Sequence, residues 1–168
     1  SISTNVIVNN GGVGISIGGG PVTITNNIIL NNAGGGISGD GGAINITGNI
    51  IADQKVIAVS ISGAGVTFSK NSVVHNEATG GPIFSLSTGY QYVNHNTWVG
   101  NKSLGSASKI ISVSGGAGSN DSWSYNNFFA NSSIYDLAYG NSNTSFNLNA
   151  KNNWWGITSD FSIQAKIF

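Results

Sequence analysis

The chain contains no cysteine and no methionine, and it has only two prolines and 7% charged residues in a length of 168. The missing cysteine excludes disulfides and thiolate chemistry. Six lysines balance six acidic residues, so no long-range field draws the chain to nucleic acid or anionic lipid. Apolar stretches are only a few residues long, too short to span a bilayer. Nucleic acid and direct membrane insertion are therefore not expected.

The abundant residues are asparagine, serine and glycine, with 24, 24 and 25 copies. These residues are poor helix formers. The 39% of hydrophobic residues, together with zero net charge, argues against disorder. A cysteine-free chain of this composition is typical of secreted surface proteins. We therefore expect an extracellular or cell-surface location.

An asparagine followed by a short apolar cluster recurs along the chain. Two further series keep step with it, one like Ile15–Ile17 and one like Val22–Ile24. Three phased short strands in about 22 residues are typical of one turn of a three-sided parallel β-helix, in which each strand pairs with its equivalent one coil later. The sequence predicts a single all-β domain over residues 1–168 with about seven coils. The repeated asparagines are Asn5, Asn27, Asn49, Asn71, Asn96, Asn127 and Asn153.

These asparagines occupy a corner too short for an ordinary turn. Such a corner needs a residue near the left-handed region, which asparagine tolerates. Stacked carboxamides can also hydrogen-bond along the axis, which predicts an asparagine ladder. A second series follows each apolar cluster at Asn9, Asn31, Asn76, Asn101 and Asn131, with Asp53 in the third copy. Loops are expected to lengthen after it, at residues 77–82 and 102–108.

Several motifs carry a resemblance to a known class of proteins. Gly41-Gly42-Ala43-Ile44 and Phe128-Phe129-Ala130-Asn131 look like the GGA(I/L/V) and FxxN repeats of bacterial surface and adhesin domains. The segment 152–156, NNWWG, is similar to a motif of surface β-helix proteins. The chain thus resembles right-handed parallel β-helix proteins of the pectate-lyase-like class. This resemblance implies a right-handed coil, but the fold hosts lyases, hydrolases, adhesins and inert shafts alike.

In enzymes that resemble this fold, catalytic residues project from the strand series represented here by Ile15–Ile17. Its outward column reads Ser16, Ser38, Ser60, Ser85, Ser112 and Ala138. Hydrolysis needs two or more carboxylates facing one bond, and only Asp40 and Asp136 are expected near this face. His75 and His95 lie at different phases, so no metal or other cofactor is expected. We predict a non-catalytic protein, with a polysaccharide lyase or glycoside hydrolase as the alternative.

Aromatic residues are concentrated late in the chain, where they either fill a wider core or form a platform for sugars. In the second case polysaccharide is a partner. One tryptophan of the 154–155 pair is expected to be exposed. The candidate glycan contacts are Trp98, Trp123, Trp154 and Trp155. Candidate N-glycosylation sites are Asn45, Asn101, Asn120, Asn131 and Asn143. Their number is no larger than the composition predicts by chance. A third function class, ice binding, would use the short polar column at Thr23, Asn45 and Thr67.

Both ends of the chain are expected to present strand edges. Residues 1–6 are already in phase with the first coil, and residues 161–168 alternate like a strand, so 157–168 is a C-terminal strand or a cap. Unpaired edges are templates for further strands. This predicts a head-to-tail homopolymer, such as a surface filament, or else a segment whose flanking coils belong to a longer β-helix. The candidate assembly residues are Ile2, Val6, Phe161, Ile163, Ile167 and Phe168.

Overall fold

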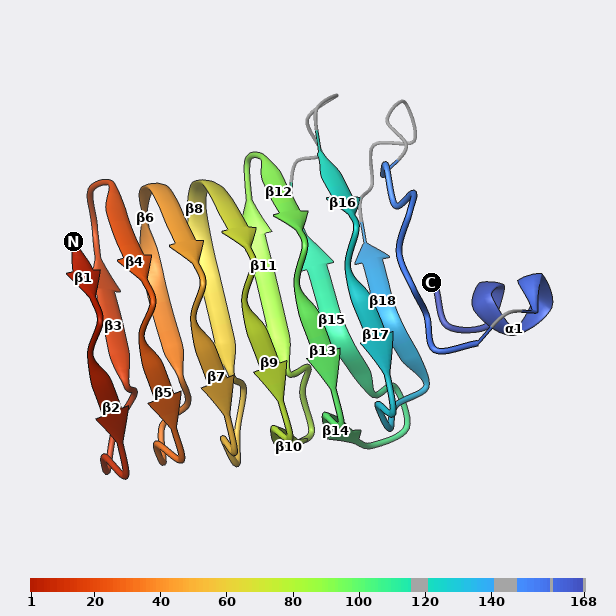
Figure 1. The fold of residues 1–168 in the computed structure, drawn as a ribbon, viewed down its shortest axis with the longest axis horizontal. Helices are drawn as coiled ribbons and strands as arrows, with labels where there is room; N and C mark the ends of the chain where they lie inside the picture. The colour runs from red at the N-terminus through yellow and green to blue at the C-terminus, as the bar shows by residue number, and fades with distance from the viewer. Residues whose placement is uncertain (116–120, 141–147, 158, 168) are drawn as a thin grey trace.

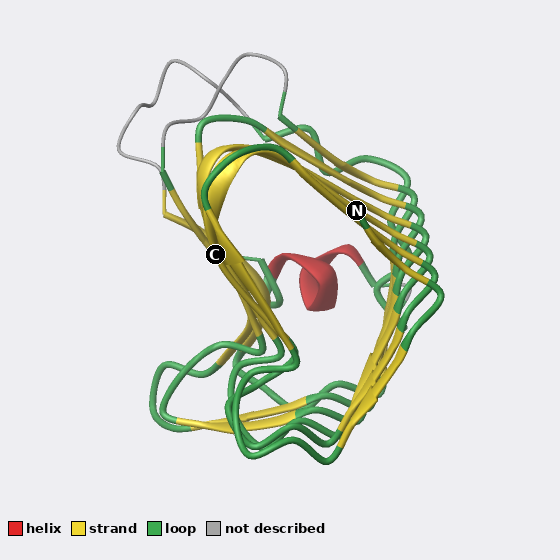
Figure 2. Cartoon of the chain, turned by 90° about the vertical axis from the view of Figure 1, so that its left-hand side faces the viewer, coloured by secondary structure: helices red, strands yellow, loops and turns green. Residues whose placement is uncertain are grey.

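The computed structural model describes residues 1–115, 121–140, 148–157 and 159–167. These residues form an all-β solenoid of stacked parallel coils, as the sequence predicts (Figure 1). The strand directions in Figure 1 and the end-on view in Figure 2 together show the chain turning clockwise as it recedes from its N-terminal end, so the coil is right-handed. The side chains that point into the coils form one continuous core cluster from Ile15 to Trp155.

The strands form three parallel sheets within the described residues. Sheet A contains β1 (Ile2–Ser3), β3 (Ile15–Gly18), β4 (Val22–Thr25), β6 (Ile37–Thr47), β8 (Val59–Ser69), β11 (Phe84–Thr88), β12 (Gln91–Asn94), β15 (Lys109–Ser114), β16 (Ser122–Ser124) and β18 (Tyr135–Gly140). Sheet B contains β2 (Val6–Val8), β5 (Ile28–Leu30), β7 (Ile50–Ala52), β9 (Ser72–Val74), β13 (Thr97–Val99) and β17 (Asn127–Phe129). Sheet C contains β10 (Glu77–Thr79) and β14 (Lys102–Leu104).

Each strand pairs in register with the equivalent strand of the next coil. In sheet B, for example, Ile7 pairs with Ile29 and Ile29 with Ile51. The alternation of the sequence sets which side chains point inward, since residues two apart on a strand share a face. The long strands β6 and β8 continue around one corner of the solenoid. At this corner Gly39 has a φ of 148°, and a Cβ there would overlap the backbone of Ile17 in the coil below.

The inward-pointing aromatic residues late in the chain fill the core. Trp98 stacks on Phe128 with ring centroids 5.9 Å apart, and Phe128 stacks on Trp155 at 4.6 Å. The equivalent inward positions of the first three coils hold Ile7, Ile29 and Ile51. Larger rings therefore replace isoleucines as the coil proceeds, which extends one apolar column through the whole rod.

An asparagine ladder follows the corner between sheets A and B. The backbone N–H and side-chain Nδ2 of each asparagine donate to the Oδ1 of the next, at 2.8–3.1 Å. The sixth position is held by buried Asn126, not by Asn127 as expected. Asn127 is the first residue of β17 and pairs with Thr97, so its side chain points outward. The ladder residues are Asn5, Asn27, Asn49, Asn71, Asn96, Asn126 and Asn153.

The left-handed residue of this corner is not the ladder asparagine but the residue before it. These residues have φ angles of 56–70° although most are not glycine, because the ladder fixes the backbone on their C-terminal side. They are Thr4, Asn26, Gly48, Lys70, His95, Tyr125 and Asn152.

A second ladder follows sheet B, displaced by one residue from the expected series in the first three coils. Val6 pairs with Ile28, and Ile28 pairs with Ile50. This register places three residues directly before the ladder, in the left-handed position with φ of 48–57°: Asn9, Asn31 and Asp53. The buried Gln54 continues the ladder through its Oε1, which accepts from the Asn32 N–H. The ladder members are Asn10, Asn32, Gln54, Asn76, Asn101 and Asn131.

The described residues form about six coils, one fewer than the sequence predicts. Among the described residues, the seventh turn is reduced to isolated bridges from Trp154 to Asn127 and from Ile167 to Leu137 in the sixth coil. Residues 157–168 are expected to form a C-terminal strand or a cap, and within them the structure has the helix α1 (Asp160–Gln164) instead of a strand over the alternating residues. The backbone carbonyl of Ser159 accepts from the Ile163 N–H at 2.9 Å. A serine directly before the first helical residue, Asp160, is typical of an N-cap. This helix-start signal outweighs the alternating pattern. Ile157 and Ile163 pack against the core, so this segment covers the C-terminal end of the rod.

Candidate functional site

One corner of the solenoid is enlarged in two adjacent coils. In the first three coils the second-ladder residue lies five positions before the next sheet A strand, as from Asn10 to Ile15. The distance grows to eight positions from Asn76 to Phe84 and to ten from Asn101 to Ile111. The added residues form sheet C and the loops that follow it. The segments 77–79 and 102–104, expected as loops, are thus paired strands.

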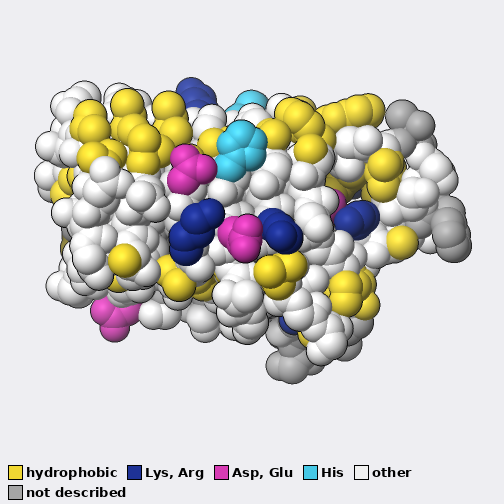
Figure 3. Space-filling view, turned by 90° about the horizontal axis from the view of Figure 1, so that it is seen from below, with side chains coloured by type: hydrophobic (Ala, Val, Ile, Leu, Met, Phe, Trp, Pro, Cys, Tyr) yellow, Lys and Arg dark blue, Asp and Glu magenta, His cyan; other side chains and the backbone are white. Residues whose placement is uncertain are grey.

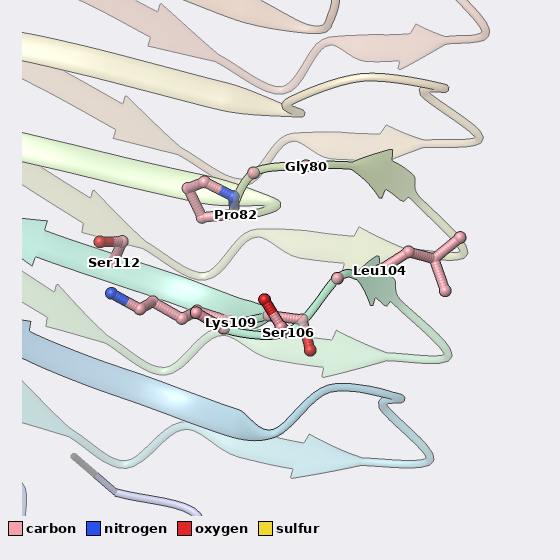
Figure 4. A pocket seen from close by; sticks show the side chains of 10 residues that line it. Gly80, Pro82, Leu104, Ser106, Lys109 and Ser112 are labelled. Carbon is pink, nitrogen blue, oxygen red and sulfur yellow. The ribbon is translucent and has the colours of Figure 1, made fainter.

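The enlarged corner encloses a groove of about 380 Å³, shown in Figure 4. The loop after β10 forms one wall and the loop after β14 the other, while β15 contributes Lys109 and Ser112. Figure 4 shows the Lys109 side chain pointing toward Ser112. The lining residues are Gly80, Gly81, Pro82, Leu104, Gly105, Ser106, Ala107, Ser108, Lys109 and Ser112.

Hydrogen bonds within the protein hold both walls of the groove. The buried Ser103 hydroxyl donates to the carbonyl of Gly81 at 2.9 Å and accepts the N–H of Lys109 at 3.2 Å. The Ser108 hydroxyl accepts the N–H of Ile134 at 3.0 Å. Lys102 and Glu77 face each other across sheet C at 3.9 Å. The groove is therefore formed before any ligand arrives, which lowers the ordering cost of binding.

Serine columns extend from the groove along sheet A. The strand register aligns Ser16, Ser38, Ser60, Ser85 and Ser112 in one outward column, which ends at buried Ala138. A second column two residues further along contains Asp40, Ser62, Ser87 and Ser114. The face offers many short hydroxyls with a regular spacing of ~4.8 Å between coils. The column that begins Thr23, Asn45 and Thr67 continues as exposed Tyr92, so its flat run of short polar groups stops after three coils.

The two acids expected near this face lie far apart and in different environments. Asp40 is exposed on β6, whereas Asp136 is 4% exposed and takes an inward position equivalent to Ile83 and Ile110. Burial raises the pKa of Asp136 to about 6, and the positive charge of Lys166 partly opposes the rise. The Asp136 Oδ1 has no hydrogen-bond partner among the described residues.

The histidines do not come together either. His75 lies at the second corner, and His95 lies at the first corner, where its ring stacks on Tyr125 at 5.1 Å. Among the described residues no three His, Asp or Glu side chains are grouped as metal ligands would be.

Three of the four tryptophans considered for glycan contact are buried away from the surface. Trp98 and Trp123 are fully buried, and Trp155 is 7% exposed, because all three fill inward positions of the core. Trp154 is 49% exposed and is the outward member of its pair. Only Trp154 keeps the role of a candidate glycan contact.

The five sequons fall into different environments. Asn45 is exposed on the outer face of β6. Asn101 is fully buried, and its Nδ2 donates to Val73 and Asn131, so glycosylation there is incompatible with the ladder. The Asn131 Nδ2 donates to the carbonyl of Trp98. Asn120 and Asn143 lie outside the described residues.

The candidate assembly residues differ between the two ends. Val6 is 68% exposed, and Ile2 is half-buried in the first coil. Ile163 packs against the core from α1, and Ile167 bridges to Leu137. The Phe161 side chain and Phe168 lie outside the described part of the chain. Ile163 and Ile167 thus belong to the covering segment rather than to a bare strand edge.

The outer face of sheet B is apolar in the early coils. Figure 3 shows apolar side chains gathered over these coils, with charged side chains on the adjacent surface. Val6, Ile28 and Ile50 form a continuous exposed column there. No helix among the described residues has the length and apolar character needed to cross a membrane.

Lys109 and the groove were not identifiable from residue types alone. The signal present in the sequence is the longer spacing of the fourth and fifth repeats, which marks where residues are added. Comparison with protein-family models, with curated proteins and with solved structures gave no match for this chain.

Proposed function

We propose that this chain is a non-catalytic structural and adhesive rod of the cell exterior that contacts glycans in the groove of coils four and five. The observation that carries this proposal is the preformed groove of about 380 Å³, lined by serine hydroxyls, backbone groups and one lysine. Its volume falls within the range of small-ligand sites, about 300–1,000 Å³. Hydroxyl and amide groups are suitable hydrogen-bond partners for sugars, and the serine columns extend the polar surface beyond the groove.

The positions of the acids support binding over hydrolysis. Glycoside hydrolysis generally uses two carboxyl groups roughly 5–9.5 Å apart. Along the rod axis alone, Asp40 and Asp136 lie four strand spacings of ~4.8 Å apart, or about 19 Å, and they also occupy different positions along their strands. None of the described residues that line the groove is acidic. A polysaccharide lyase or glycoside hydrolase remains the competing function.

The first test is a panel of soluble polysaccharides in affinity electrophoresis, combined with assays for reducing ends and unsaturated products. We expect retardation by at least one polysaccharide with no product formed. The Asp40→Asn and Asp136→Asn variants should be retarded equally. Turnover that disappears in either variant would establish the enzymatic alternative instead.

Association through the first coil is a second part of the proposal. In this chain β1 and β2 each pair with a strand on one side only, among the described residues. Such an edge accepts additional strands in register. A head-to-tail contact would have to build on the segment that covers the other end, including α1.

Sedimentation over a wide range of protein concentration tests this association. We expect the intact chain to form larger species as concentration rises, and Ile2→Lys to remain monomeric because it places a charge at the exposed edge. Ser72→Lys, on a central strand, serves as the matched control. A strictly monomeric intact chain at high concentration would contradict self-assembly.

A further inference from the structure

The groove has a charge that nothing within it balances. Lys109 is the one charged residue among the ten that line the groove. Lys102 lies on sheet C nearby but faces Glu77 at 3.9 Å, whereas Lys109 has no ion-pair partner in the described part of the chain. An unpaired ammonium in a preformed groove is an attractive position for an anion.

The acids on neighbouring coils do not neutralise Lys109. Asp136 lies in the next coil but is turned into the core, where the positive charge of Lys166 acts on it. Asp40 lies three strand spacings from the coil of Lys109, about 14 Å away. Interactions between exposed charges beyond a Debye length of about 8–10 Å are largely screened at ordinary ionic strength.

Two serine hydroxyls accompany Lys109 along the groove. Ser112 lies on the same strand, and Lys109 points toward it in Figure 4. Ser106 is exposed on the loop after β14 and lies near the backbone end of the Lys109 side chain (Figure 4). A negative group at the ammonium would therefore have the Ser112 hydroxyl beside it, and the Ser106 hydroxyl lies further along the same groove as a donor for the rest of a sugar ring.

We propose that the groove binds the negatively charged group of an acidic sugar, with the Lys109 ammonium on the carboxylate or sulfate and the hydroxyls of Ser106 and Ser112 on neighbouring sugar oxygens. This inference rests on the proposed glycan binding and specifies its ligand. The inserted residues of coils four and five, absent from the first three coils, then serve as the walls of an anion-selective subsite.

The test compares dextran, dextran sulfate and alginate as probes in affinity electrophoresis of the full chain. Dextran is neutral, dextran sulfate carries only sulfate, and alginate carries only carboxylate. We expect tighter binding to one or both acidic polymers than to dextran. Lys109→Ala should lower that affinity about tenfold, while Lys109→Arg should retain most of it. Lys55→Ala, which removes a lysine from the equivalent corner of the third coil, should change little.

The outcomes separate this inference from the proposed function. If Lys109→Ala loses affinity for only one of the two acidic polymers, the charged group of that polymer is the one that Lys109 binds. Unchanged binding of both acidic polymers by Lys109→Ala, or an equal loss of dextran binding, overturns the anionic subsite while glycan binding stands. No retention of any polysaccharide by the intact chain overturns the proposed function together with it. Unfolding curves of each variant show whether a loss arises from misfolding.

Discussion

Replacing Asn49 with alanine should lower the free energy of unfolding by about 4 kcal/mol. The Asn49 side chain makes five hydrogen bonds in a fully buried corner. Its Nδ2 donates to the carbonyls of Ile24 and Thr47 and to the Oδ1 of Asn71, and its Oδ1 accepts from the N–H and Nδ2 of Asn27. Alanine leaves these partners buried without replacement bonds. A typical domain has only about 5–15 kcal/mol of stability, so the change is a large fraction of the total.

Urea unfolding followed by circular dichroism measures this effect. The matched control is Asn5→Ala, at the first position of the same ladder. Asn5 is exposed, and its Nδ2 donates only to the Ser3 carbonyl and the Asn27 Oδ1, so we expect a loss below about 1 kcal/mol. Equal losses at both positions would mean that the interior ladder contributes no more than its exposed end.

Replacing Asp136 with asparagine should stabilise the protein at neutral and alkaline pH. The pKa of Asp136 rises from 3.8 to about 6 in the folded protein, chiefly because burial disfavours its charge. The folded state therefore holds the proton more tightly than the unfolded state. This stability is fully present below pH 3.8 and is lost as the pH rises to about 6, a total of about 3 kcal/mol. An asparagine side chain does not ionise, so the variant should lack this loss.

Unfolding free energies measured between pH 4 and 8 test the prediction. Asp136→Asn should be similar to the natural chain near pH 4 and more stable by up to about 3 kcal/mol at pH 8. The control is Asp53→Asn, because Asp53 is exposed and occupies the same left-handed position as Asn9 and Asn31. Parallel pH profiles for the natural chain and Asp136→Asn would show that the buried carboxyl is not the source of the pH dependence.

The repeat of the sequence was sufficient to predict the solenoid, because parallel stacking in register requires every coil to keep the same phase. It could not fix positions where two asparagines are adjacent. Asn126 and Asn127 are chemically identical, and only the pairing of Asn127 with Thr97 decides which enters the ladder. The same ambiguity explains why the sequence predicts Asn9 for the second ladder, whereas the structure places Asn10 there. Register errors of one residue reverse which side chain is buried.

The candidate site was harder to predict than the fold. The groove depends on three-dimensional placement of residues added at one corner, and their sequence resembles ordinary loop. Nothing in the sequence distinguishes Ser103 from the other serines, although its hydroxyl links the two walls of the groove. At the C-terminus, alternation predicts a strand, but the Ser159–Asp160 start of α1 and the packing of Ile163 on the core favour a helix. Local capping signals and tertiary contacts together decide such short segments.

The constant register of the first three coils bears on how a rod of this kind changes length. The segment from Asn27 to Gly48 is one whole coil, and the equivalent Asn49 comes directly after it, 22 positions after Asn27. Its deletion would join Asn26 to Asn49, again a left-handed residue followed by a ladder asparagine. Whole coils in this half are thus interchangeable modules that insertion or deletion can add or remove. In the fourth and fifth coils the same event would remove a wall of the groove, so the two halves of the rod are open to different kinds of evolutionary change.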